Sequence, residues 1–349
     1  MTRPIVVKLG SGLVAAADGS PRAELLRARA GEIAELVGGG TPVCLVSSGA
    51  IALGLPKLGL TRRPRSLPRL QAASALGQGA LQGAWEEAFA PFGPSVAQVL
   101  LTSAEIADRR AYVNVRNTLT ALFAARAVPV VNENDATATD EITFGDNDAL
   151  AAQTAVLAGA QLLVLLTSVH GVLTHPPGDE RAEVIADGAH ARGATIGRAN
   201  AEGRGGMASK IAAAELAAGA GIPTVIAAGT DDGVLGAVAR GERRGTWFEP
   251  AASGESAFKL WLRHGKRIAG RVHLDAGAVA AVATGGRSLL AVGVTRCDGD
   301  FRAGDGIELC GPDGSAVGRG IASVDASELA GRPANLEAVH RDRLVLYAA

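Results

Sequence analysis

Apolar runs recur along the N-terminal two-thirds of the chain, and each run ends in polar or glycine residues. The runs do not alternate apolar with polar side chains, which is typical of strands buried on both faces of a sheet. Ala-rich stretches between them indicate helices. This alternation predicts a mainly parallel sheet sandwiched by helices. The strands are expected within residues 4–10, 43–46, 94–102, 127–135, 160–168 and 221–229, and the helices within 22–37, 71–90, 105–127, 148–158 and 208–220.

The pattern changes after about residue 250. Short strands broken by Gly, Asp and Pro fill residues 271–349, which predicts a small, mostly β domain. A chain of 349 residues is long enough for two domains. We therefore expect an α/β domain at 1–250, a linker at 251–269 and a mostly β domain at 270–349.

Composition narrows the class of protein. The 34 Lys and Arg residues nearly balance the 35 Asp and Glu residues, so no overall charge favours nucleic acid or an anionic membrane. No apolar run approaches the roughly 18 residues of a membrane helix, and the N-terminus does not resemble a signal peptide. The three cysteines, at 44, 297 and 310, match no metal or disulfide spacing. These features predict a cytoplasmic protein with inert thiols.

Polar clusters follow four of the predicted strands. In a parallel sheet the carboxyl ends of the strands meet at one edge, where ligands bind. Each cluster alone has an ordinary explanation, such as a helix cap or a turn, and only their convergence on one edge favours a ligand site. The clusters are Lys8 with Gly10-Ser11-Gly12, Ser47-Ser48-Gly49, Asn132–Asp135 and Thr167-Ser168.

A glycine-rich loop, "GRGGMASK" at 203–210, ends in a lysine at the start of a predicted helix. Backbone N–H groups at a helix start bind anions, and Lys210 adds a full charge, although the spacing is not that of a P-loop. Residues 130–148 carry six carboxylates and no lysine or arginine. Lysines, glycine loops and carboxylates together are the components of a phosphoryl-transfer site.

Several strings, in this order, resemble the glutamate 5-kinase family of the amino acid kinase superfamily. They are "VVKLGSG", "VSSGAIALG", "QAASALGQGAL", "QVLLT", "NTLTALFAARAVPVVNENDATATDEITFGDNDALAA" and "GGMASKIAAAELAAGAGI", of which "VNEND" and "FGDND" are the most specific. Residues from about 270 resemble a PUA domain. The resemblance implies ATP-dependent phosphorylation of the γ-carboxylate of L-glutamate to L-glutamyl 5-phosphate, the first step of proline biosynthesis.

The resemblance also implies roles for individual residues. Lys8, Asp148 and Lys210 would be catalytic, with Asp148 holding the two lysines, and Ser48, Asp135 and Asn147 would bind glutamate. No general base is implied, because the attacking carboxylate is already ionised at neutral pH. The nucleotide would contact Lys8, Gly10, Thr167, Ser168, Arg204, Gly205, Gly206, Met207, Ala208, Ser209 and Lys210.

The nucleotide side departs from the family pattern at several positions. Thr167-Ser168 replaces the usual Thr-Asp, and His175-Pro176-Pro177 replaces a stretch that contains Asp-Pro. Arg204 takes the place of a threonine, and Gly-Ser-Gly follows Lys8 instead of Gly-Thr-Ser. We expect an active kinase with an altered nucleotide pocket. His170 and His175 lack partners at metal spacing and are expected in a surface turn.

Two alternative functions remain open, besides a regulatory or assembly role of the C-terminal domain alongside catalysis by the N-terminal one. A sister kinase could act on aspartate, N-acetylglutamate, carbamate or a nucleotide, against which "NEND", "GDND" and the PUA-like domain argue. An RNA-binding protein with a decayed kinase domain is the other alternative. Residues 258–349 hold twelve Lys and Arg against ten Asp and Glu, a surplus too small to favour RNA.

The resemblance extends to cofactors and partners. It implies ATP with Mg²⁺ carried mainly by the nucleotide, so no metal-ligating side chains are expected. It implies L-glutamate as substrate, L-proline as a feedback inhibitor and a homo-oligomer, either a dimer or a tetramer. We expect no membrane association and no RNA binding by the PUA-like domain.

Overall fold

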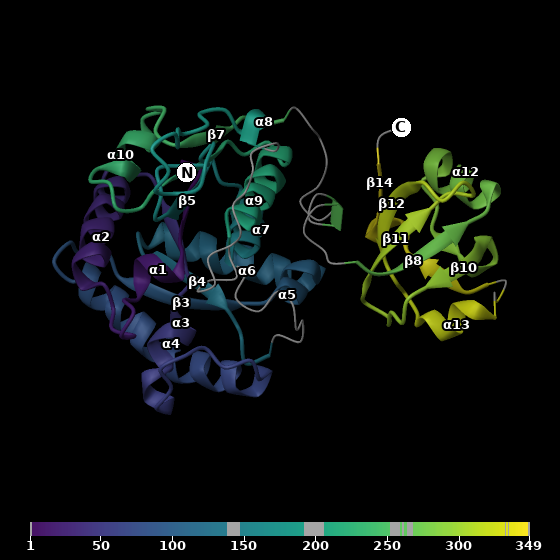
Figure 1. Ribbon diagram of the computed structural model, residues 1–349, viewed down its shortest axis with the longest axis horizontal. Helices are drawn as coiled ribbons and strands as arrows, with labels where there is room; N and C mark the ends of the chain where they lie inside the picture. The colour runs from purple at the N-terminus through teal and green to yellow at the C-terminus, as the bar shows by residue number, and fades with distance from the viewer. Residues whose placement is uncertain are drawn as a thin grey trace. The chain divides into compact units, whose positions relative to one another are not determined.

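The computed structural model describes residues 2–137, 147–191, 206–251, 259, 262–263, 268–331, 333 and 335–347. The chain divides into two compact units, Met1–Ser253 and Gly254–Ala349 (Figure 1). None of the helices formed by the described residues combines the length and apolar character that a membrane crossing requires.

A seven-stranded sheet forms the centre of the first unit, in the order β3-β4-β2-β1-β5-β6-β7. All neighbouring strands are parallel except β7, which runs antiparallel to β6. The predicted mainly parallel sheet is therefore confirmed. The strands are β1 (Ile5–Leu9), β2 (Val43–Ser47), β3 (Val96–Leu101), β4 (Val128–Glu133), β5 (Leu162–Thr167), β6 (Thr224–Ala228) and β7 (Thr246–Phe248).

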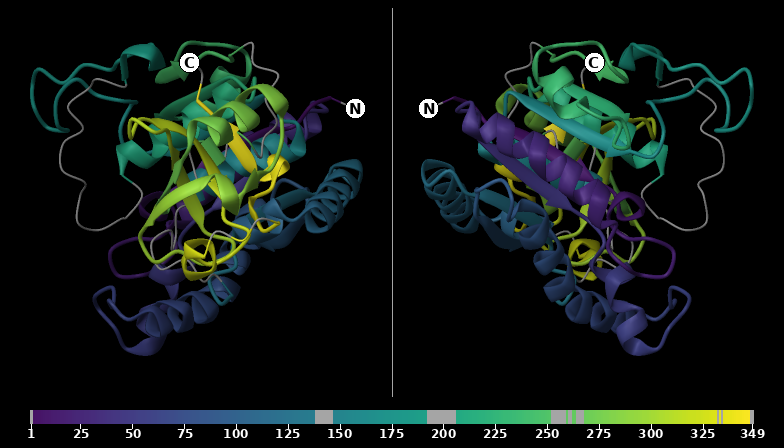
Figure 2. Two further views of the ribbon diagram at one scale, coloured as in Figure 1. Left: turned by 90° about the vertical axis from the view of Figure 1, so that its right-hand side faces the viewer. Right: turned by 90° about the vertical axis from the view of Figure 1, so that its left-hand side faces the viewer.

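Helices cover both faces of this sheet (Figures 1 and 2). Residues of α2, α4 and α10 share one apolar core with the sheet, and α7 and α9 pack together on the opposite face. The helices are α1 (Ser11–Val14), α2 (Ala23–Gly38), α3 (Ala50–Gly54), α4 (Leu67–Phe89), α5 (Ser103–Ala107), α6 (Arg109–Ala124), α7 (Asn147–Ala158), α8 (Gly188–Ala191), α9 (Met207–Gly219) and α10 (Val234–Ala239), with a 3₁₀ helix at Pro56–Leu58.

The alternation of side chains along β1 decides where Lys8 points. Val7 and Leu9 belong to the apolar core beneath α2, α4 and α10. Because successive side chains of a strand point to opposite faces, Lys8 points to the α7 and α9 face. Lys8 pairs with Val46 of β2 and Leu165 of β5, so it lies at the middle of the sheet.

Helices α3 and α4 cross at two glycines. A Cβ added to Gly54 would collide with the carbonyl oxygen of Ala73, and one added to Gly77 would collide with that of Ala50. The two backbones therefore approach closely only because neither position has a side chain. This contact fixes the height of α4 along the edge where the strands end.

The second unit is mostly β, as predicted. A five-stranded sheet has the order β10-β8-β11-β12-β14, and β13 pairs with β9. Phe301, Ile307 and Leu309 lie fully buried in its own apolar core. Its elements are β8 (Ile268–Leu274), α12 (Ala276–Gly285), β9 (Leu289–Leu290), β10 (Val294–Asp298), β11 (Gly306–Cys310), β12 (Ala316–Ile321), α13 (Ala326–Ala330), β13 (Glu337–Val339) and β14 (Leu344–Leu346), with 3₁₀ helices at Ala291–Gly293 and Arg341–Arg343.

Two details differ from the sequence prediction. The single helix expected at 105–127 is two helices, because Asp108 caps α6 by accepting hydrogen bonds from the backbone N–H groups of Arg110 and Ala111. The short strand β7 was not predicted. It is only three residues long, so it carries little periodicity of its own.

Candidate active site

Two lysines and one aspartate meet on the α7 and α9 face of the sheet. Lys8 Nζ lies 2.6 Å from Asp148 Oδ1, and Lys210 Nζ lies 3.1 Å from Asp148 Oδ2. All three side chains are buried, with exposed fractions of 3%, 0% and 6% for Lys8, Asp148 and Lys210. The structure therefore brings together the three residues predicted to be catalytic.

The aspartate remains ionised in this setting. Burial of Asp148 opposes ionisation, but the charges of Lys8 and Lys210 outweigh it and lower the pKa of this carboxyl from 3.8 to about 2. The Ser209 hydroxyl also donates to Asp148 Oδ2 over 2.7 Å. Two ammonium groups thus share one carboxylate, and positive groups of this kind favour an anion beside them.

Amides and hydroxyls form a second group at the ends of β2 and β4. Asn147 Nδ2 donates to Ser48 Oγ over 2.9 Å and to Asn132 Oδ1 over 2.9 Å. Asn132 Nδ2 in turn donates to Gln78 Oε1 of α4 over 2.8 Å. Asn147 Oδ1 is buried and has no hydrogen-bond partner within the described residues.

Asp135 lies just beyond β4 and is also buried. The Ser74 hydroxyl of α4 donates to Asp135 Oδ2, and Asp135 Oδ1 has no hydrogen-bond partner in the described part of the chain. Burial raises the pKa of Asp135 above its ordinary value, against the opposing effects of the Ser74 hydrogen bond and the Arg63 charge. A buried carboxylate with a free oxygen is suited to a cationic donor.

Local backbone geometry explains why small residues follow the strands. Gly49 caps α3 with φ 119°, a left-handed conformation, and a Cβ there would lie 2.8 Å from Val14 Cγ1. Ser48 thus sits at a turn that only glycine allows. Gly10 caps α1, and a Cβ there would lie 3.7 Å from Lys8 Nζ.

Beside Lys8 and Gly10, the predicted nucleotide residues that the structure describes fall in two groups. Thr167 ends β5 with a half-buried side chain, and Ser168 follows it with an exposed one. Gly206 caps α9, and Met207, Ala208, Ser209 and Lys210 form its first turn beside Asp148. Arg204 and Gly205 lie outside the described residues, as do Asp140, Glu141 and Asp146 of the acidic stretch.

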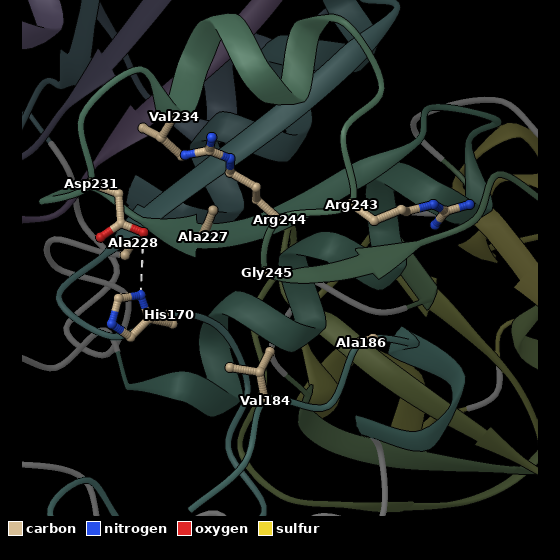
Figure 3. Close-up of a pocket in the computed structure, with 10 residues that line it drawn as sticks. All are labelled: His170, Val184, Ala186, Ala227, Ala228, Asp231, Val234, Arg243, Arg244 and Gly245. Atoms are coloured by element: carbon tan, nitrogen blue, oxygen red, sulfur yellow. Dashed lines mark hydrogen bonds and ion pairs between the residues drawn. The ribbon is translucent and has the colours of Figure 1, made fainter.

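A cavity of about 260 Å³ opens at the ends of β5 and β6 (Figure 3). His170 and Asp231 line it and contact each other, with Nδ1 and Oδ2 3.2 Å apart, and Arg244 also lines it. His175 contacts its neighbour Thr174. Among the described residues no group of three or more His, Cys, Asp or Glu could hold a metal ion.

The loop that carries Asp231 is held by a fully buried arginine of α2. Arg29 Nη1 donates to the carbonyl oxygens of Gly229 and Asp231 over 2.9 and 2.6 Å, and Nη2 pairs with Glu32 over 2.6 Å. Glu32 accepts from the backbone N–H groups of Gly233 and Leu235. This network joins α2 to the C-terminal end of β6 and to the start of α10.

Reasoning from the sequence missed the contributions of α4. Ser74 and Gln78 were part of a quoted motif but had no assigned role. The only signal was two polar side chains four residues apart on one face of an Ala-rich helix.

Two family models match the chain. The amino acid kinase family matches residues 3–228, and the PUA domain matches residues 270–333. The chain therefore belongs to the amino acid kinase family, and it carries a PUA domain after the kinase domain.

Curated relatives similar to this chain have the name glutamate 5-kinase. That of Novosphingobium aromaticivorans is 45% identical over 98% of this chain and 95% of its own length. Those of Myxococcus xanthus and Streptomyces coelicolor are 42% and 44% identical, each over 99% of this chain and 96% of their own length.

Proposed function

We propose that this protein transfers the γ-phosphoryl group of ATP to the γ-carboxylate of L-glutamate, forming L-glutamyl 5-phosphate and ADP at the first step of proline biosynthesis. Membership of the amino acid kinase family and full-length relatives named glutamate 5-kinase support this function. The observation in the structure that carries it is the pair of buried lysines that share the Asp148 carboxylate.

The chemistry needs charge neutralisation rather than a base. An ionised γ-carboxylate oxygen of glutamate forms a bond to the γ-phosphorus while the bond from that phosphorus to the bridging oxygen of ADP breaks. Lys8 and Lys210 neutralise the negative charge on the phosphoryl oxygens, and Asp148 holds both lysines in place. The N–H groups at the start of α9 and the Gly10 turn would hold the phosphates.

Glutamate would bind at the second group of residues. Its α-ammonium offers donors to the free oxygens of Asp135 and Asn147, and Ser48 lies beside them through its contact with Asn147. The substrate would thus supply the positive charge that offsets Asp135.

The proposal extends to the cofactors and partners that the family resemblance implies. Mg²⁺ would be carried mainly by ATP. We also propose a cytoplasmic homo-oligomer that L-proline inhibits by competing in the glutamate region. Ser168 and the His175-Pro176-Pro177 stretch would alter nucleotide affinity or selectivity.

The test is an ADP-release assay with L-glutamate and Mg-ATP, in which hydroxylamine traps the acyl phosphate as a hydroxamate. Both products should form with glutamate and should be weak or absent with aspartate, N-acetylglutamate, carbamate or UMP. Lys210→Ala serves as the control for background. Turnover with glutamate no higher than that control would overturn the proposal.

A further inference from the structure

Ser47, the last residue of β2, and its neighbour Ser48 point to opposite faces of the sheet. Ser48 Oγ contacts Asn147 Nδ2 of α7 over 2.9 Å, on the side proposed to receive glutamate. Ser47 Oγ instead accepts a hydrogen bond from the indole N–H of Trp85 in α4 over 2.9 Å, and both of these side chains are fully buried. Ser48 therefore faces the substrate group, whereas Ser47 faces α4.

The hydrogen bonds at Ser47 have a fixed direction. An indole nitrogen can only donate, so Ser47 Oγ must be the acceptor from Trp85. The single hydrogen of the Ser47 hydroxyl then donates to the backbone carbonyl oxygen of Ser48 over 3.1 Å. Because a carbonyl oxygen can only accept, the two hydrogen bonds run from α4 to the turn after β2 and cannot run the other way.

One peptide group of this turn depends on the Ser47 hydroxyl. The N–H group of Ser48 donates to the carbonyl oxygen of Leu9 in β1 over 3.1 Å, and the carbonyl oxygen of Gly49 accepts from the N–H group of Leu53 in α3 over 2.9 Å. The peptide group between them consists of the Ser48 carbonyl and the Gly49 N–H. Within the described part of the chain, the hydrogen bond that holds this group comes from Ser47.

The glycine at position 49 would otherwise let this peptide group turn over. Gly49 has φ 119°, and half a turn of the preceding peptide would bring φ into the ordinary negative range, which glycine adopts as readily. The Ser48 carbonyl oxygen would then point away from Ser47, toward the side where Ser48 Oγ meets Asn147. The negative end of a peptide dipole on that side would oppose the carboxylates of glutamate.

We propose that Ser47 is a positioning residue for the glutamate site and that Trp85 holds it in that role. The indole N–H keeps the Ser47 hydroxyl directed at the Ser48 carbonyl. This second hydrogen bond keeps the peptide group after Ser48, and with it the Ser48 side chain, in the arrangement that receives glutamate. The inference rests on the proposed function, because that function assigns Ser48 to glutamate.

Threonine and valine at position 47 isolate the hydroxyl, because the two side chains have nearly the same shape and both suit a strand. Ser47→Thr should keep the KM for glutamate within about threefold of that of the unsubstituted enzyme. Ser47→Val should raise this KM on the order of tenfold, because a buried hydrogen bond is lost. The KM for ATP should change less than about threefold in both variants, since Ser48 is assigned to glutamate and not to the nucleotide.

Trp85→Phe tests the donor. It keeps an aromatic ring beside Phe89 but removes the indole N–H, and it should raise the KM for glutamate about threefold. In a Ser47→Val background the same substitution should have no further effect on this KM, because the hydroxyl on which the indole acts is already absent. A contribution of Trp85 through packing alone would persist in that background.

Trp247→Phe is the matched control. The indole N–H of Trp247 in β7 donates over 3.1 Å to the carbonyl oxygen of Arg244, so this variant also loses an indole hydrogen bond. It should leave the KM for glutamate unchanged. A KM does not depend on how much of the enzyme is folded, so a lower yield of any variant does not imitate the expected result.

A rise in the KM for glutamate in Ser47→Val that is absent in Ser47→Thr, with no further effect of Trp85→Phe in the double variant, supports the assignment. Equal rises in the KM for glutamate and for ATP, equal values in the threonine and valine variants, or additive effects of the two substitutions would overturn it. No turnover of glutamate by the unsubstituted enzyme would instead overturn the proposed function.

Discussion

Lys8 Nζ lies 2.6 Å from one carboxylate oxygen of Asp148. Asp148 belongs to α7, which begins at Asn147, far from Lys8 in the sequence. Lys210 Nζ pairs with the other carboxylate oxygen of Asp148. The carboxylate thereby sets the separation of two ammonium groups that would otherwise repel each other. The spacing of the lysines, as much as their charge, depends on this aspartate.

Asp148→Asn should therefore disable the proposed reaction without emptying the glutamate site. The amide removes the charge that holds both lysines, so kcat should fall about 10²- to 10³-fold, as when a charge-stabilising group is lost. The KM for glutamate should change little. Initial rates over a range of glutamate concentrations check this, with Asp108→Asn as a control because that exposed residue only caps α6. A large rise in glutamate KM with normal kcat would contradict the assignment.

Asp135→Asn should raise the KM for glutamate on the order of 30-fold or more, because a buried charge partner of the ammonium is lost. The KM for ATP should stay nearly constant. An equal loss of affinity for both substrates would refute this division of the site.

Asp135 should also make the KM for glutamate depend on pH. The pKa of Asp135 is raised, so its protonated fraction grows as the pH falls through that raised value, and a protonated carboxyl attracts ammonium less strongly. The glutamate KM should thus rise toward acid pH. This rise should be smaller in Asp135→Asn, which has no such proton to gain. Parallel pH profiles of KM in the two enzymes would count against the idea.

Two glycines of α4 should respond oppositely to alanine. Gly77→Ala forces a side chain into the Ala50 carbonyl, so unfolding should require about 2 kcal/mol less free energy, as in other overpacked sites. The shift of α4 should also raise the glutamate KM through Ser74 and Gln78. Gly79→Ala points into open space and should stabilise the helix by about 0.5–1 kcal/mol. Denaturant unfolding measures both, and equal effects would disprove the crossing as described.

Arg29→Met should destabilise the first unit by about 3–5 kcal/mol, because it leaves Glu32 and two carbonyl groups without their buried cation. Arg27→Met is the matched control on the exposed side of α2 and should change the free energy of unfolding by less than about 0.5 kcal/mol. Thermal melting of the two variants suffices. Similar melting temperatures would show that the buried network contributes little.

The sheet could be predicted from the sequence because its strands are continuous apolar runs. The sequence also indicated that Lys8, Ser48 and Asp135 would gather at one edge, since parallel strands all end there. The pairing of Lys8 and Lys210 with Asp148 came from family resemblance, and the structure places the three side chains in contact.

The contribution of Gln78 could not be read from the sequence. Its contact with Asn132 depends on the height of α4, and that height depends on the Gly54 and Gly77 crossing. The sequence around a glycine in a helix does not show which other backbone packs against that glycine. Asp108 was the opposite case, because aspartate is among the preferred N-cap residues, a signal that the expected continuous helix overlooked.

The central position of β1 also has a consequence for the growing chain. Among the strands of this sheet β1 is made first, but one of its neighbours begins at Val43 and the other only at Leu162. One edge of β1 therefore stays open until β5 has been made, and Lys8 lacks the Asp148 carboxylate until that residue has been made. Because an unpaired strand edge can pair with the wrong segment, the most central strand of the sheet is the one exposed to mispairing until β5 has been made.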